Sequence, residues 1–275
     1  MRKVELLAPA GSMEALIAAV QNGCDAVYLG GHQFNARAYS DNFDHEKMIE
    51  AIRYAHGYGV KIYVTMNTLL YENEMANAIV YARFLYEHGV DALIIQDLGL
   101  FDVVRQCFPD MECHASTQLH IHNEAGIRKM AELGFSRIVL PRETPIEAVR
   151  QYAKLKVELE VFVQGALCVS YSGQCLMSAK KLNRSGNRGA CAQMCRMKYR
   201  LGYEEKGELR YAKQNGEYLI SPKDLNTLKH VPELIAAGIT SFKIEGRMKR
   251  PEYVAQMTAL YRQAIDAYEQ SSFYD

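Results

Sequence analysis

The chain has 275 residues, 49% of them hydrophobic and 23% charged, which is enough to bury one large core. Its 32 basic and 32 acidic residues cancel at pH 7, so no global field attracts nucleic acid or a membrane, and such a partner must bind a local patch. The N-terminal apolar run is too short for a signal peptide, and no run reaches the about 18 residues of a membrane span. We therefore expect a soluble cytoplasmic protein with no membrane partner.

Short β-rich runs alternate with longer helical patterns along the chain. Strands are predicted at residues 4–8, 26–29, 61–66, 92–95, 112–115, 137–140, 160–163 and 241–244. Helices are predicted from about residue 12 and over about 44–57, 73–88, 98–106, 123–133, 145–154 and 251–270. The strands are continuous apolar runs, which is typical of strands that helices cover on both sides.

Eight such units predict an α/β fold of the (β/α)8 TIM-barrel type. A doubly wound open sheet is the alternative, but no Gly-x-Gly-x-x-Gly motif follows the first strand. Gly59, Gly89, Gly134 and Gly238 each precede a strand, and we expect them to end the helices there.

One interval departs from this pattern. Residues 166–240 separate the seventh strand from the eighth, where a plain loop has roughly two to six residues. We interpret it as a cysteine-rich insertion within one barrel domain that covers residues 1–275. Within it, the segments Tyr199–Tyr203 and Leu209–Tyr211 predict a β-hairpin, and Tyr218–Ile220 predicts a further strand.

Four of the seven cysteines fall in this insertion: Cys168, Cys175, Cys191 and Cys195. An odd total without a secretion signal argues against a disulfide framework. The spacing is C-x6-C-x15-C-x3-C, and its first gap is longer than the about two to four residues typical of a structural zinc pair. Iron–sulfur clusters accept looser spacing. The spacing favours an iron–sulfur site, and zinc or unligated thiols are the alternatives.

The same region lacks acidic residues. From residue 161 to residue 203 there is no Asp or Glu, whereas seven basic residues are present: Lys180, Lys181, Arg184, Arg188, Arg196, Lys198 and Arg200. These cations either compensate the charge of thiolates around a cluster or bind an anionic substrate, such as an RNA backbone or a carboxylate metabolite. Both interpretations stay open.

Polar residues gather where the predicted strands end, which is where a barrel carries its active site. The candidates are Asn67, Gln96, Asp97, His114, Ser116, Thr117, Gln118, Arg142, Gln164, Lys243, Glu245 and Arg247. The run His114–Gln118 is difficult to explain by packing, although His114 alone can also be a structural histidine. Tyr171, between the first two cysteines, is placed to stack on a substrate or to pack over a cluster.

Several of these segments together resemble the signature of the collagenase-like peptidases, peptidase family U thirty-two. They are Glu160–Cys168, Ser170–Ser178, Gly186–Arg196, Ser221–Asp224, Lys243–Arg247 and, near the N-terminus, Glu5–Gly11. The resemblance spans nearly the whole chain and implies a barrel domain. Members of the family usually continue into a C-terminal domain, so we expect this chain to be an N-terminal fragment of a longer protein.

The resemblance implies two rival activities. Older members of the family were described as collagenases, whereas better-understood relatives are bacterial RNA and ubiquinone hydroxylation proteins that hold a [4Fe–4S] cluster and use prephenate. The resemblance therefore implies that the four clustered cysteines bind such a cluster, with zinc or an empty site after aerobic preparation. Some relatives place a ligand cysteine where this chain has Asn226, which argues against the ubiquinone branch.

We accordingly expect an enzyme that hydroxylates a tRNA wobble uridine or a cytidine of 23S rRNA, with prephenate as the small carboxylate co-substrate. The expected catalytic residues are His114, Gln118, Arg142, Glu245 and Arg247. Arg142 and Arg247 are expected to clamp the carboxylates, unless both are structural partners of Glu143 and Glu245. The expected substrate contacts are Tyr171, Arg184, Arg188, Arg196, Asn67, Gln164 and Lys243.

Peptidase is the alternative activity. The sequence contains neither a His-Glu-x-x-His helix nor a Gly-x-Ser-x-Gly elbow. Cys113 and His114 are adjacent, but neighbours on a strand point to opposite faces, so they do not form a nucleophile–base pair. A non-catalytic RNA- or collagen-binding module with a structural metal is the second alternative, which the polar strand ends do not favour.

Overall fold

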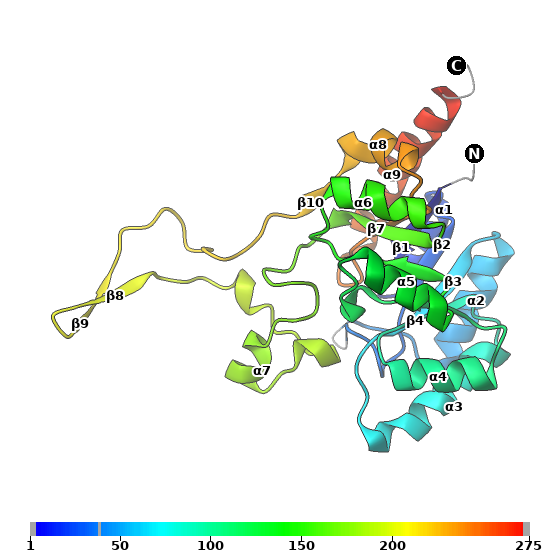
Figure 1. Cartoon of the computed structure of the whole chain (residues 1–275), viewed down its shortest axis with the longest axis horizontal. Coiled ribbons are helices and arrows are strands. Elements are labelled where there is room, and N and C mark those ends of the chain that lie inside the picture. The colour runs from blue at the N-terminus through cyan, green and yellow to red at the C-terminus, as the bar shows by residue number, and fades with distance from the viewer. Residues whose placement is uncertain (1–3, 38–39, 272–275) are drawn as a thin grey trace.

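The computed structural model describes residues 4–37 and 40–271. Eight parallel strands form a closed barrel (Figure 1): β1 (Glu5–Pro9), β2 (Ala26–Leu29), β3 (Lys61–Met66), β4 (Ala92–Ile95), β5 (Glu112–Ala115), β6 (Arg137–Val139), β7 (Glu158–Gly165) and β11 (Ser241–Ile244). Each strand pairs in parallel with its neighbour, β11 lies between β7 and β1, and the pairing of β6 with β7 closes the circle. The predicted TIM barrel is confirmed, and the open sheet is excluded.

Helices surround the barrel. They are α1 (Met13–Gln21), α2 (His45–Gly57), α3 (Met75–Glu87), α4 (Leu98–Cys107), α5 (Glu124–Leu133), α6 (Ile146–Tyr152) and α9 (Pro251–Ser271), and single 3-10 turns are η1 (Glu72–Glu74), η2 (Thr117–Leu119) and η3 (Ala153–Leu155). The main apolar core fills the space between strands and helices, and a smaller cluster that includes Leu7, Tyr28 and Tyr63 lies apart from it. No helix in the described ranges combines the length and apolar composition that crossing a membrane requires.

The helix ends predicted at four glycines are confirmed, and side-chain caps begin several of the helices. Side chains of Ser12, Asp44, Asp97 and Asn123 accept hydrogen bonds from backbone N–H groups in the first turns of α1, α2, α4 and α5. Each of the four predicted glycines has a positive φ, between 72° and 106°, which is the left-handed conformation in which helices commonly end. These caps set the positions from which the strands start.

The insertion contains two short helices, α7 (Met177–Leu182) and α8 (Val231–Ala236), and the turns η4 (Gly186–Arg188), η5 (Met194–Arg196) and η6 (Leu228–His230). The predicted hairpin is confirmed as β8 (Gly202–Glu205) and β9 (Glu208–Tyr211). The strand predicted at Tyr218–Ile220 is wrong, because these residues form a turn with largely exposed side chains and no strand beside them. Instead, β10 (Leu225–Asn226) pairs antiparallel with the end of β7.

The helix-ending glycines lead to a stability prediction. Gly134 has a φ of +106°, so Gly134→Ala should lower the free energy of unfolding by about 1–2 kcal/mol. Gly57, the last residue of α2, has no atom within 4 Å of an added Cβ, and Gly57→Ala should be neutral or stabilising by up to about 1 kcal/mol. Urea unfolding of both variants measures these changes in the free energy of unfolding. Equal changes would contradict the conclusion that Gly134 is required by its positive φ.

Candidate functional site

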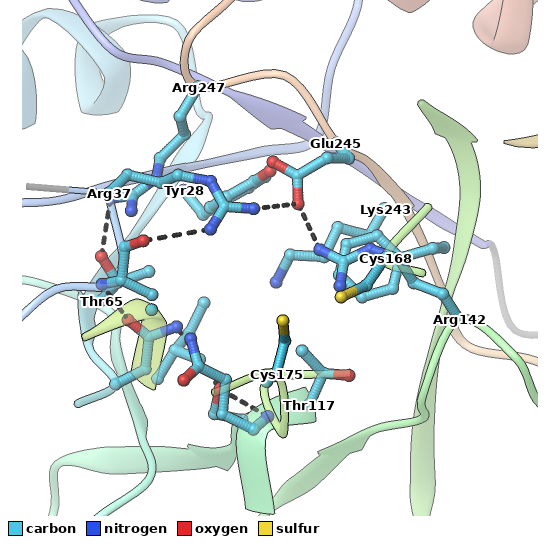
Figure 2. A pocket seen from close by; sticks show the side chains of 18 residues that line it. Tyr28, Arg37, Thr65, Thr117, Arg142, Cys168, Cys175, Lys243, Glu245 and Arg247 are labelled. Carbon is cyan, nitrogen blue, oxygen red and sulfur yellow. Dashed lines mark hydrogen bonds and ion pairs between the residues drawn. The ribbon is translucent and has the colours of Figure 1, made fainter. Parts of the chain in front are cut away.

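A polar cavity opens at the carboxyl ends of the barrel strands (Figure 2). Its walls come from β2, β3, β4, β7 and β11, from the segments that follow β2, β5, β6 and β11, and from the insertion. The charged and polar residues that line it are Tyr28, Arg37, Thr65, Asn67, Ser116, Thr117, Gln118, Arg142, Cys168, Cys175, Lys243, Glu245 and Arg247. The sequence therefore placed Asn67, Gln118, Arg142, Lys243, Glu245 and Arg247 in one site because parallel strands end on the same side.

Glu245 holds two of the arginines. Its Oε2 accepts hydrogen bonds from Nη2 of Arg142, after β6, and from Nη2 of Arg37 at 3.1 Å, in the loop after β2. Burial opposes ionisation of this carboxyl, but the charges of Arg37 and the two other arginines of the cavity outweigh burial and lower the Glu245 pKa to about 2. Glu245 is therefore a carboxylate at any pH at which the protein is handled.

Arg247 is held by neutral groups. Its Nη1 donates to Thr65 Oγ1 at 2.8 Å and its Nη2 donates to Asn35 Oδ1 at 2.9 Å. Burial, reinforced by the charge of Arg37, lowers the pKa of Arg247 to about 10. A side chain at Gly30 would overlap the guanidinium and both of its acceptors, so only glycine fits there. Thus Arg142 is paired with Glu245, whereas Glu143 accepts hydrogen bonds from Ser172 and Arg247 is held by neutral acceptors.

The cavity has an excess of positive charge. Four cations, Arg37, Arg142, Arg247 and Lys243, line it with one carboxylate, Glu245. Lys243 is also paired, because its Nζ donates to the buried Glu160 at 2.7 Å. Among the described residues that line the cavity, two positive charges are therefore left uncompensated.

Two polar atoms in the described part of the cavity wall are buried without a hydrogen-bond partner, Oε1 of Gln118 and Nε of Arg142. Such atoms are rare unless a water or ligand satisfies them. Asn67 differs, because its Oδ1 accepts from the backbone of Ala36 at 3.0 Å and its Nδ2 donates to Ser116. Asn67 thus shapes the wall as well as lining it.

The four clustered cysteines gather beside this cavity, and all are free. Cys168 and Cys175 line it, and Cys168 also lines an adjoining cavity with Cys195. The backbone N–H of Gln193 donates to Cys191 Sγ at 3.4 Å. Burial raises the pKa of Cys195, and the charges of the other three thiols raise it further against the effect of Arg196.

We tested whether these thiols fit a cluster. In the described ranges, no three His, Cys, Asp or Glu side chains converge as the ligands of a single metal ion do. An iron–sulfur cluster is larger than one ion and takes one thiolate at each iron, so four thiols match its ligand number and type. A cation borders them as well, since Glu245 and, more weakly, Cys191 and Cys168 raise the pKa of Arg37. The donor set fits a four-iron cluster.

Three arginines expected to contact substrate hold the insertion together. Arg188 donates to Leu69 O and Glu74 and lies over the Tyr71 ring. Arg196 donates to the carbonyls of Leu167 and Pro222 and to Ser221. Arg184 donates to Ala190 O at 3.2 Å. Their structural contacts account for these side chains without a substrate.

Other candidates lie away from the cavity wall. His114 is fully buried, edge-on to the Tyr63 ring, and burial lowers its pKa, so its placement favours the structural interpretation. Gln164 is buried and its Oε1 accepts from the Tyr261 hydroxyl at 3.3 Å. Tyr171 is 67% exposed and packs against His122.

Sequence reasoning missed Arg37, Tyr28, Thr65 and Phe162. Arg37 is the most consequential, because it pairs with Glu245 and lines both cavities. Its signal was its position in the long loop after the second strand, on the side where a barrel carries its site. Phe162 supports Arg142, whose guanidinium carbon lies 4.0 Å from its ring centre.

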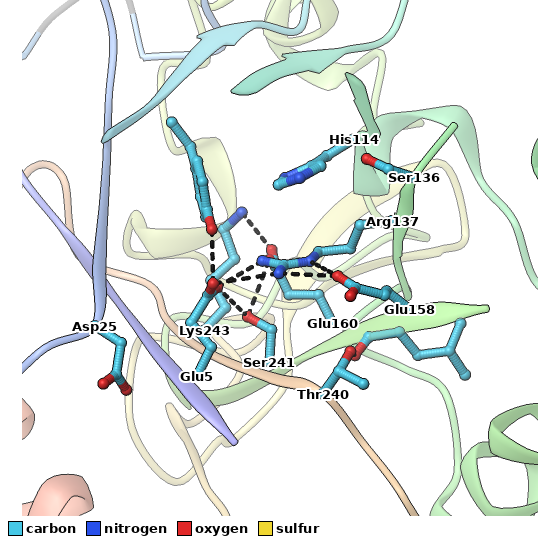
Figure 3. A network of polar contacts seen from close by, with 12 residues as sticks. Glu5, Asp25, His114, Ser136, Arg137, Glu158, Glu160, Thr240, Ser241 and Lys243 are labelled. Carbon is cyan, nitrogen blue, oxygen red and sulfur yellow. Dashed lines mark hydrogen bonds and ion pairs between the residues drawn. The ribbon is translucent and has the colours of Figure 1, made fainter. Parts of the chain in front are cut away.

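A buried ion-pair network lies next to the cavity (Figure 3). Glu160, on β7, accepts from Lys243 of β11 and from Arg137 of β6. Arg137 also donates to Glu5 of β1 and to Glu158 of β7. Lys243 belongs to both the network and the cavity wall, so the charge of the cavity depends on Glu160.

Comparisons with known proteins show which families and proteins this chain is similar to. The model of peptidase family U32 matches residues 11–275. The tRNA hydroxylation protein P1 of Bacillus subtilis is 40% identical over 271 residues, which are 97% of this chain and 64% of that protein. The 23S rRNA 5-hydroxycytidine C2501 synthase of Escherichia coli is 41% identical over 266 residues, which are 96% of this chain and 40% of that protein. The chain thus spans less than two thirds of these relatives.

A solved structure shows the same fold. The U32 peptidase Mk0906 superposes with a TM-score of 0.59 at 13% identity, over 89% of this chain and 93% of that one.

The buried network leads to a second prediction. Glu160→Ala leaves Lys243 and Arg137 short of a counter-charge and should lower the free energy of unfolding by about 3–5 kcal/mol. Burial opposes ionisation of Glu160, but Lys243 and Arg137 lower its pKa. Its contribution is therefore present above the unfolded pKa of about 4.5 and is lost as the pH falls below it. Urea unfolding between pH 7 and roughly pH 3 measures both effects.

Glu124→Ala is the matched control. Glu124 pairs with Arg128 on the surface of α5, where its side chain is 52% exposed, so the change should stay below about 1 kcal/mol. A Glu160 variant as stable as this control would show that the network does not stabilise the barrel.

Proposed function

The chain belongs to peptidase family U32, and from this membership and its cationic barrel mouth we propose that it hydroxylates a base of tRNA or rRNA. The observation that carries the proposal is one cavity lined by unpaired positive charge and by cysteines of a four-thiol group. Two relatives that share most of this chain are named for RNA hydroxylation. A redox-capable centre beside an anion site is what such a reaction needs.

Hydroxylation converts a C–H bond of the base into C–OH, which is a two-electron oxidation. A donor that gives up an oxygen atom, and is itself reduced by two electrons, therefore has to bind together with the RNA. We propose a small dicarboxylate, prephenate, in the cavity. Arg247 and Arg142 would each offer a planar fork of N–H donors to a carboxylate. Arg142 is already directed by Glu245 and Phe162, and Arg247 by Thr65 and Asn35, so neither has to reorganise on binding.

Cys168, Cys175, Cys191 and Cys195 would hold a [4Fe–4S] cluster. When bound, it supplies one-electron transfer at the edge of the cavity. The chain's own contribution is the surrounding charge: Arg37 borders the thiols, and the Gln193 N–H donates to Cys191. Positive charge and N–H donors stabilise thiolates over thiols.

RNA would approach over the insertion. Lys180 and Lys181, in the last turn of α7, are exposed and stand in the acid-free segment. Lysines in such positions attract phosphates without reading sequence. We propose these two lysines, and not Arg184, Arg188 and Arg196, as the contacts to the RNA backbone. The three arginines already make hydrogen bonds within the protein.

The geometry favours this activity over peptide hydrolysis. Burial raises the pKa of the Cys113 thiol to about 12, and the thiol faces the apolar core rather than His114. A cysteine nucleophile needs a low pKa and a base within reach. Cys113 has neither.

The arginines give the third prediction. Arg142→Lys and Arg247→Lys replace a two-donor fork with a single ammonium, so each should lower RNA hydroxylation by roughly 100-fold. The visible spectrum of the cluster should not change, because neither residue is a ligand. Mass spectrometry of RNA treated with the full-length protein measures the modification.

Arg128→Lys on the surface of α5 is the control and should retain full activity. Normal hydroxylation by both cavity variants, or metal-independent cleavage of collagen peptides by the intact protein, would be incompatible with the proposal.

The thiols give the fourth prediction. Serine at any of the four clustered cysteines should remove most of the iron and sulfide from protein purified without oxygen, because each thiolate holds one of about four irons. Cys107→Ser, at the exposed end of α4, should change neither content. One equivalent of zinc without labile sulfide in the wild-type protein would exclude the cluster while leaving the cavity tests unaffected.

A further inference from the structure

A hairpin arm, formed by β8 and β9, projects from the insertion away from the barrel (Figure 1). Every residue of both strands is exposed, and so are several apolar side chains, among them Leu209 at 66% and Tyr211 at 58%. An isolated two-stranded hairpin is only marginally stable in water. Within the described part of the chain, nothing covers this arm.

The arm presents an open strand edge. Its register pairs Glu205 with Glu208 across a two-residue turn, and the N–H of Ala212 donates to Leu201 O at 2.9 Å. Hydrogen-bonded and non-hydrogen-bonded pairs alternate along an antiparallel ladder. The N–H and C=O groups of Leu209 therefore face away from β8, as do those of Tyr211. Such an edge is a template for another strand.

We propose that this edge pairs with the same edge of a second copy of the chain, antiparallel, about a two-fold axis at Leu209. In that register Leu209 lies opposite the partner subunit's Leu209, and Glu208 lies opposite the partner subunit's Arg210. The axis also sets Arg210 opposite the partner subunit's Glu208, so the dimer contains two ion pairs on one face of the sheet and the Leu209 pair on the other. A self-complementary patch of this kind is what a two-fold interface requires.

The arm also has an apolar face that the pairing extends. A Cβ at Gly202 would lie 3.0 Å from Leu209 Cδ1 and 3.7 Å from Tyr211 Cε1, so both side chains lie over this glycine on one face. Pairing two arms places four such side chains side by side on a four-stranded sheet. An independently stable sheet needs three or more strands with an apolar face, and the paired arms meet this requirement.

The charges of the arm argue against pairing through the β8 edge and against RNA as the partner. Two-fold pairing of β8 about Glu204 would set two glutamates against each other, which is destabilising. Residues 199–218 contain four basic and four acidic residues, and Arg210 is paired with Glu205 at 2.6 Å. An arm without net charge has no electrostatic attraction for a phosphate backbone.

The test exchanges charges between two copies. Glu208→Arg sets arginine against arginine across the axis, and Arg210→Glu sets glutamate against glutamate, so each variant alone should dimerise roughly tenfold or more weakly than the wild type. An equimolar mixture should regain dimerisation, because each interface then contains two opposite-charge pairs. Sedimentation equilibrium of the full chain, under reducing and oxygen-free conditions, measures the association.

The mixture separates pairing between copies from damage to one hairpin, which mixing would not repair. Glu217→Arg, at the base of the arm, is the control and should leave dimerisation unchanged. A wild-type chain that stays monomeric at about 100 μM, variants that associate like the wild type, or a mixture no better than its components would each overturn the proposal. Loss of RNA binding without loss of association would instead assign the arm to RNA.

Discussion

The carboxylate of Glu160 is the group on which the barrel and its site both depend. It lies at the seam where β6, β7 and β11 meet, fully buried, between the charges of Arg137 and Lys243. Removing three charges from water is unfavourable, so they persist only as a set. Because Lys243 also reaches the cavity, the network that closes the barrel fixes the charge of its mouth as well.

The charged side chains at the barrel mouth are held in place, but their charges do not cancel. Glu245 directs two arginines, neutral acceptors direct a third, and the excess charge is left facing the cavity. Donors held in this way can bind an anion without rearranging. Preorganised donors interact strongly with charge in a partly buried site. The thiols of the insertion stand at the rim of the same cavity, so anion and redox centre would be neighbours.

The barrel could be predicted because its signals are local. Apolar runs marked the strands, and Gly134 marked a helix end, so polar strand-end residues such as Arg142 could be gathered into one site. The predictions that were wrong or missing concern residues whose structure depends on contacts between segments far apart in the sequence. The run at Tyr218 lies beside no strand of the described structure. Arg188 forms an ion pair with Glu74, which is far away in the sequence, and Arg37 lies in a loop whose sequence has no helix or strand period.

The length of the insertion has an entropic consequence. Closing a loop of about 75 residues instead of five adds only about 2 kcal/mol, because loop entropy grows with the logarithm of length. Ordering that loop is far more costly, at roughly 1–2 kcal/mol for each residue fixed. The barrel therefore tolerates a long insertion, whereas the insertion must generate its own order, through contacts such as those that Arg196 makes.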